Sequence, residues 1–164
     1  MVKQAIENEI EIVPIPGACA AINALIVSGM STKEFTFIGF LPVDKKPKQQ
    51  KLEEVKRLKQ TLIFYEAPHK LINTLMSIQE ILGDRKIALA KEITKIHEEY
   101  IRGNVSSALG KIYNPKGEYV IIVEGSSEGE LDEKQKILSN LSLKEHYEYY
   151  EKQGYEKKEI IKKI

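Results

Sequence analysis

The fold class of this chain is decided by the stretch Thr61-Leu62-Ile63-Phe64-Tyr65-Glu66-Ala67-Pro68-His69-Lys70. Its first half is a short apolar run of the kind that forms a buried strand. Its second half gathers a phenol, a carboxylate, an imidazole and an ammonium ahead of an apolar helix pattern, whose first turn suits Pro68. Polar groups at a strand-to-helix junction are typical of ligand crevices in α/β sheets. In an equally weighted alternative, Glu66 caps the helix and the side chains of His69 and Lys70 are only solvated.

Alternating strand and helix patterns extend on both sides of this stretch. Before it we predict a helix end at 3–8, a strand at 9–13, a helix at 18–28, a strand at 35–40 and a helix in the second half of 45–59. After it we predict a helix at 71–82, a hairpin of strands 86–93 and 99–105, a helix at 106–113 and a buried strand at 117–123. This order predicts an α/β domain over residues 1–125, with a mixed sheet of about five strands and flanking helices.

Residues 126–164 are predicted to form a linker and a short helical tail. The linker composition is Gly-Ser-Ser-Glu-Gly-Glu at 125–130, and two apolar helix patterns follow it around Gly154. Two short helices around a glycine resemble the beginning of a helix-turn-helix unit. The pattern alone favours the alternative, an ordinary helical hairpin packed on the main domain.

The composition of the chain limits the functions that it can have. The chain has 164 residues, 30% of them charged, and a formal net charge of +1, so any basic surface must be local. The single cysteine, Cys19, excludes an internal disulfide, and the three histidines show no metal-ligand spacing. The N-terminus shows no signal-peptide pattern and no apolar run reaches membrane-spanning length. We therefore expect a cytoplasmic location, no membrane association and no metal.

Two further segments are candidates for a binding role. The turn Pro14–Ala20 contains Gly17, which permits close backbone approach to a ligand, although a tight helix–sheet turn explains it equally well. Cys19 within it is predicted to be a small buried thiol rather than a nucleophile. The segment 91–99 ends a predicted strand in mixed charges, and alternation places Lys91, Ile93 and Lys95 on one side. Its alternative is an exposed charged hairpin.

The stretch 45–59 is the most basic part of the chain. It holds seven basic residues against two acidic ones, and such a segment could contact phosphates. Pro47 and the lack of interleaved aromatic residues favour a mobile loop followed by a solvated helix.

Taken in order, these segments resemble one family. Three blocks carry the resemblance: residues 14–42, which begin Pro-Ile-Pro-Gly-Ala-Cys-Ala; residues 62–71; and residues 91–98, followed by Gly103 and Lys116-Gly117-Glu118-Tyr119-Val120. They are similar to the bacterial small-subunit rRNA cytidine-2′-O-methyltransferases, of the tetrapyrrole (corrin/porphyrin) methylase superfamily of S-adenosylmethionine enzymes. The resemblance covers residues 3 to 125. It departs at Cys19, where the family usually has serine, and at Lys70 and Lys91, where it usually has arginine.

The resemblance implies a division of the site. Family members begin with a separate cofactor domain that nothing in this chain matches, so we expect this chain to be the C-terminal domain, with an incomplete cofactor site and no activity alone. The implied S-adenosylmethionine contacts are Pro16, Gly17, Ala18, Tyr65, Ala67 and Pro68. The implied catalytic candidates are Glu66, His69 and Lys95, and the implied RNA contacts are Lys70, Lys91 and Lys95.

Two other functions compete with RNA methylation. One is C-methylation of a corrin or porphyrin ring within the same superfamily. The other is a non-enzymatic module that binds RNA or a partner protein. In each case we expect a homodimer, because superfamily members are dimers and because an apolar cleft wall at 18–24 would be exposed.

Overall fold

The computed structural model describes residues 1–127 and, beyond them, Tyr147 and Tyr150, which are helical. The predicted helical tail otherwise lies outside the described residues. The elements, in chain order, are α1 (Val2–Glu7), α2 (Ala20–Ser28), β1 (Phe35–Phe40), α3 (Lys45–Val55), β2 (Thr61–Glu66), α4 (Pro68–Leu82), β3 (Lys86–Lys91), β4 (Glu99–Asn104), α5 (Val105–Lys111) and β5 (Tyr119–Val123).

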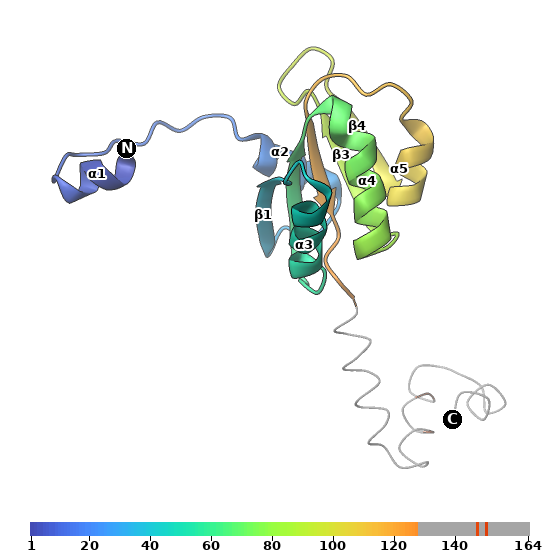
Figure 1. Ribbon diagram of the computed structural model, residues 1–164. Helices are drawn as coiled ribbons and strands as arrows, with labels where there is room; N and C mark the ends of the chain where they lie inside the picture. The colour runs from blue at the N-terminus through green and yellow to red at the C-terminus, as the bar shows by residue number, and fades with distance from the viewer. Residues whose placement is uncertain (128–146, 148–149, 151–164) are drawn as a thin grey trace.

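The strands form one mixed sheet in the order β1-β2-β5-β3-β4. β1 and β2 are parallel, whereas β5 runs antiparallel to both of its neighbours, and β3 pairs with β4 as the predicted hairpin. The ends of β1, β2 and β3 therefore lie at the same edge of the sheet as the beginning of β5. The mixed sheet with flanking helices confirms the predicted fold class (Figure 1).

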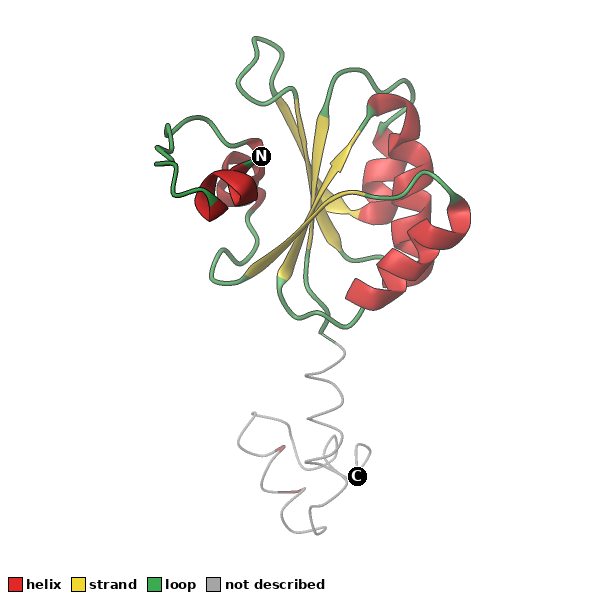
Figure 2. Ribbon diagram, turned by 60° about the vertical axis from the view of Figure 1, so that its left-hand side comes forward, coloured by secondary structure: helices red, strands yellow, loops and turns green. Residues whose placement is uncertain are grey.

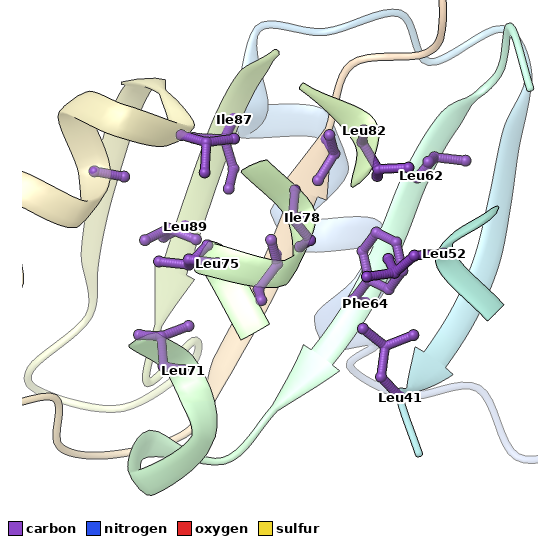
Figure 3. Close-up of a cluster of buried hydrophobic side chains, with 14 of the residues drawn as sticks. Leu41, Leu52, Leu62, Phe64, Leu71, Leu75, Ile78, Leu82, Ile87 and Leu89 are labelled. Atoms are coloured by element: carbon purple, nitrogen blue, oxygen red, sulfur yellow. The ribbon is translucent and has the colours of Figure 1, made fainter. Parts of the chain in front are cut away.

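One face of the sheet carries the main core. Helices α3, α4 and α5 cover it, and the spacing of Leu71, Leu75, Ile78 and Leu82 turns one side of α4 into the sheet. These side chains meet the fully buried Phe64 and residues of β3 (Figure 3). All five residues of β5 are buried, as its β-branched composition predicts for a central strand.

The opposite face is covered in part by α2. The small residues Ala21 and Ala24 allow this helix to lie close against Ile63, Ala88 and Ile122. Figure 2 views the sheet nearly edge-on, with helices on both of its sides. Because α2 packs on β5 and β3, the β1 side of this face stays open, and Phe37 there is 52% exposed.

The predictions for two segments are wrong. Residues 9–13 form no strand, because no neighbouring strand offers them a ladder and Glu9 has a φ of 56°. Residues 45–50 are helical rather than a loop, because Pro47 falls in the first turn of α3, where its missing N–H costs no hydrogen bond.

Residues 1–19 form an arm that leads away from the sheet, with α1 toward its end (Figure 1). All of them are exposed except Ala5, which is half-buried. The expected apolar wall at 18–24 is only partly exposed, because Ala21 and Ala24 are buried against the sheet. Its outward-facing apolar side chain is Ile22, at 41% exposure. Among the described residues no helix is both long and apolar enough to cross a membrane.

Candidate active site

A pocket opens at the edge where β2 and β3 end and β5 begins. Its volume is about 520 Å³, within the range of small-molecule sites. It draws residues from all three blocks that carried the family resemblance. Its lining consists of Ala20, Phe40, Tyr65, Glu66, Ala67, Pro68, His69, Ala90, Ile93, Glu118, Tyr119 and Val120.

Aromatic rings form one wall of this pocket. Tyr65 meets Phe37 and Phe40 edge-to-face, with ring centroids 5.1 and 5.6 Å away. Strict alternation along β1 would send these two phenylalanines to opposite faces. A bulge between Phe37 and Gly39, where Gly39 has a φ of 73°, shifts the register so that both lie beside Tyr65. The bulge therefore brings Phe40 to the pocket.

The Glu66 carboxylate is buried, and each of its two oxygens accepts a hydrogen bond. It accepts hydrogen bonds from the Ala67 N–H at 2.9 Å and the Thr74 hydroxyl at 2.6 Å. The N-cap of α4 is Ala67, which makes no side-chain cap bond, and Pro68 occupies the first helical turn as predicted. Glu66 thus fixes the start of α4 to the end of β2 and presents a carboxylate to the pocket.

A loop at 92–98 borders the pocket and is tied to the turn before β5. Glu92 Oε1 accepts the N–H of Glu118 at 2.8 Å, and Lys95 Nζ lies 2.9 Å from the same oxygen. The Glu118 N–H and the Lys95 ammonium lower the pKa of Glu92. Lys95 Nζ also lies 3.3 Å from Glu118 Oε2, and the Glu92 and Glu118 bonds raise the Lys95 pKa. We refer to this Glu92–Lys95–Glu118 group as the loop clamp.

Lys91 is paired as well. Its Nζ lies 3.0 Å from Glu99 Oε2 across the hairpin, and this bond raises its pKa. The nearby Tyr119 is buried, and burial raises the pKa of its phenol. The predicted alternation over 91–95 is wrong, because β3 ends at Lys91 and both Glu92 and Thr94 adopt positive φ values.

The structure brings together the second predicted block. Tyr65, Glu66, Ala67, Pro68 and His69 all line the pocket. Lys70 follows one residue later on α4 and does not line it. Lys95 lies outside the lining but pairs with Glu118, which belongs to it.

The first predicted block contributes less. Pro16, Gly17 and Ala18 are exposed and lie outside the lining, which Ala20 enters two residues later. An added Cβ at Gly17 would meet no described atom within 4 Å, so no close approach among the described residues requires glycine there. Cys19 is exposed, and the prediction of a buried thiol is wrong, because the helix begins only at Ala20.

Sequence reasoning did not identify several pocket residues. Glu118 and Tyr119 lie there because β5 runs antiparallel to β2, which pairs Tyr119 with Glu66. Strand direction is not visible in a single apolar run. The one indication in the sequence that Glu118 and Tyr119 belong to the site is their place in the segment Lys116–Val120, which is part of the family resemblance. Within the described part of the chain no cluster of three or more His, Cys, Asp or Glu residues could hold a metal ion.

The fold places this chain in the class of α/β domains with a mixed five-stranded sheet flanked by helices. A solved structure of the methyltransferase CobJ has the same fold, with a TM-score of 0.56 at 18% identity over 77% of this chain and 58% of that one. More specifically, residues 1–109 match the family Tetrapyrrole (Corrin/Porphyrin) Methylases, and the chain belongs to that family.

Curated relatives share far more sequence. The "Ribosomal RNA small subunit methyltransferase I" of Bacillus subtilis (strain 168) is 47% identical over 93% of this chain and 53% of its own length. The protein of the same name from Halalkalibacterium halodurans is 44% identical over 100% of this chain and 57% of its own length. The chain thus spans a little over half the length of these relatives.

Proposed function

We propose that the chain is part of an S-adenosylmethionine-dependent methyltransferase that methylates small-subunit rRNA, at the 2′-hydroxyl of a cytidine. The observation that carries this proposal is a pocket in which residues of all three blocks of the family resemblance meet. The name shared by the two relatives supports the rRNA substrate. Because the chain spans about half of those relatives, we further propose that it supplies one wall of the cofactor site, without activity alone.

The pocket suits the proposed cofactor. S-adenosylmethionine supplies a methyl group on a cationic sulfonium. A cation is favoured beside aromatic faces and carboxylates, and this pocket offers Tyr65 and Phe40 together with Glu66 and Glu118. Ala67 and Pro68 add an apolar wall without bulky side chains. Pro16, Gly17 and Ala18 lie two to four residues before the lining and would contact the cofactor only at the pocket rim.

The residues of this chain would act mainly by positioning the ribose hydroxyl against the methyl group. A sugar hydroxyl is a poor nucleophile, so it gains from alignment with the methyl group and from a nearby proton acceptor. His69 is the exposed, pocket-lining candidate for that role. Glu66 already accepts two hydrogen bonds, so it would act by orienting groups around it. Lys95 would act through Glu118, with which it pairs.

Methyl transfer to RNA tests the proposal directly. A version of this chain extended to the length of its relatives is incubated with undermethylated small ribosomal subunits and labelled S-adenosylmethionine. We expect label in the rRNA at a cytidine whose 3′ linkage resists alkaline hydrolysis, because a 2′-O-methyl group blocks that cleavage. Label in a corrin or porphyrin precursor and not in RNA would overturn the substrate, and an alkali-sensitive methylated nucleotide would overturn the position.

The extended protein also distinguishes an enzyme from a non-enzymatic binding module. If the 164-residue chain binds RNA and the extended protein transfers no methyl group to any of these substrates, the non-enzymatic alternative holds. Isothermal titration of the 164-residue chain should detect only weak S-adenosylmethionine binding or none. Micromolar binding would contradict an incomplete site.

We also propose a homodimer. The exposed apolar side chains Ile22, Ile26 and Phe37 lie on α2 and β1, around the open part of one sheet face. Patches of this kind commonly mediate self-association. Light scattering at high concentration should give twice the monomer mass, and a monomer there would contradict the proposal.

A further inference from the structure

The cations at the pocket edge divide into paired and unpaired ones. Lys91 is bound to Glu99, and Lys95 is bound to both Glu92 and Glu118. Two of the three lysines assigned to RNA are therefore already neutralised by carboxylates within 4 Å. In the described part of the chain, Lys45, Lys46 and Lys70 make no ion pair.

These three unpaired lysines lie together by topology. Phe40 and Tyr65 are directly paired on the parallel strands β1 and β2, and both line the pocket. Lys45 follows Phe40 by five residues and Lys70 follows Tyr65 by five, while α3 and α4 pack against each other. Lys45, Lys46 and Lys70, which we name the basic ridge, therefore lie near the edge of the sheet at which the pocket opens, on helices that cover the opposite face.

The basic ridge conflicts with the local rules for helix stability. Cations are unfavourable in the first turn of a helix, where the macrodipole favours acidic side chains. Nevertheless α3 begins with Lys45 and Lys46 directly after its N-cap Asp44, α4 carries Lys70 in its first turn, and neither first turn contains an acidic residue. Residues that are unfavourable for helix stability are expected at functional sites. Lysines in the first turns of two neighbouring helices fit that expectation.

From this we infer that the RNA backbone docks on the basic ridge, through Lys45, Lys46 and Lys70, rather than on the paired lysines of the hairpin. The inference rests on the proposed rRNA substrate and names the surface that receives it. The ammonium groups make the contacts, and they would hold phosphates beside the pocket that receives the ribose. Lys45 and Lys46 are exposed and need no rearrangement to do so, whereas the hairpin lysines would first have to leave their carboxylates.

The test measures RNA affinity against salt concentration for the 164-residue chain and a labelled small-subunit rRNA hairpin. Replacing Lys45 and Lys46 together by alanine should weaken binding and reduce the salt slope by about 0.9 for each lysine. Lys33→Ala with Arg57→Ala is the matched control. It removes the same charge from exposed positions at the opposite edge of the sheet and should leave affinity and slope unchanged.

A second variant separates binding from folding. Replacing Lys45 and Lys46 by glutamate should raise thermal stability, because acidic residues suit the first turn of α3, while it removes the RNA affinity that these two lysines supply. Loss of affinity together with loss of stability would overturn the inference.

Three results contradict the inference. They are no RNA binding by the chain, equal losses in the ridge and control variants, and a greater loss when Lys91 and Lys95 are replaced by alanine. None of them bears on methyl transfer by the extended protein, which is measured separately. Conversely, RNA binding that depends on the ridge would stand even if no methyl group were transferred.

Discussion

The Thr74 hydroxyl donates a 2.6 Å hydrogen bond to the Glu66 carboxylate, and both side chains are buried. Thr74 lies two turns into α4, whereas Glu66 ends β2, so the bond joins the helix to the strand behind the pocket. A buried carboxylate is unfavourable unless its oxygens are hydrogen-bonded. This pair explains how a charged side chain is tolerated in a largely apolar pocket.

We expect Thr74→Val to destabilise the fold. Valine keeps the shape of threonine but leaves one Glu66 oxygen without a donor, which costs about 1–3 kcal/mol of unfolding free energy. Thr74→Ser, which keeps the hydroxyl, should lose less. Urea denaturation measures both. A Thr74→Val protein as stable as the parent would show that the bond contributes nothing.

A second prediction concerns Gly117, in the turn before β5. Its φ is 79°, and a Cβ there would come within 2.5 Å of the Glu92 side chain. Gly117→Ala should therefore lower the free energy of unfolding by about 1–2 kcal/mol from the left-handed backbone alone, and it should also displace Glu92 from the loop clamp.

Gly110→Ala is the matched control for Gly117→Ala. Gly110 lies in α5, and no described atom lies within 4 Å of the Cβ that alanine would add, so alanine should stabilise the helix by about 0.5–1 kcal/mol. Equal effects of the two substitutions on the urea midpoint would refute the assigned role of Gly117.

The sequence predicted the sheet because its strands are short, apolar and separated by clear stop signals. The helices predicted at 18–28 and 71–82 end where predicted, and each is followed by a glycine with positive φ, Gly29 and Gly83. The strand proposed at 9–13 failed because alternation shows what a segment can do, not whether a partner strand lies beside it. The start of α3 was missed because Pro47 and the lack of interleaved aromatic residues favour a loop, whereas proline is tolerated in the first turn of a helix, where Pro47 lies.

The pocket was predictable only in part. The consecutive residues Tyr65 to His69 could be found as one polar cluster. The contribution of Phe40 depends on a bulge at Gly39, and that of Tyr119 on the direction of β5. Both are properties of strand pairing, which no local pattern specifies. The same holds for the ion pairs of Lys91 with Glu99, which lies in β4, and of Lys95 with Glu118, which directly precedes β5.

A third prediction uses the pKa of Glu92, which is lowered from 4.5 by the Glu118 N–H and then by Lys95. The pKa of Glu92 is lower in the folded state than in the unfolded state. As the pH falls, the unfolded state therefore binds the proton at a higher pH than the folded state does. The clamp's stabilisation is then present above about pH 4.5 and is lost as pH falls through the folded pKa.

The Glu118 amide reports this titration, because its N–H donates to Glu92 Oε1. In a two-dimensional NMR titration its proton resonance should shift with a midpoint below pH 4.5. The shift should vanish in Glu92→Gln, which has no titrating group. A midpoint at or above 4.5 would contradict the clamp.

The last prediction concerns the end of α2, the helix that covers the pocket face of the sheet. Arg102 Nε and Nη2 donate hydrogen bonds of 2.9 and 2.6 Å to the Val27 carbonyl, one of the unsatisfied acceptors at the helix C-terminus. A cation there also complements the helix dipole. Because the guanidinium is exposed, Arg102→Ala should cost about 1 kcal/mol of unfolding free energy.

The geometry of the guanidinium should matter as well as its charge. Arg102→Lys keeps the cation but loses the planar fork that gives Val27 two donors, so its stability should lie between those of Arg102→Ala and the parent. Arg57→Ala removes an exposed arginine outside α2 and should change stability by less than about 0.5 kcal/mol. Urea denaturation ranks the three variants, and amide exchange at the end of α2 should quicken only when Arg102 is replaced. If Arg102→Ala and Arg57→Ala unfold at the same midpoint, the capping role is wrong.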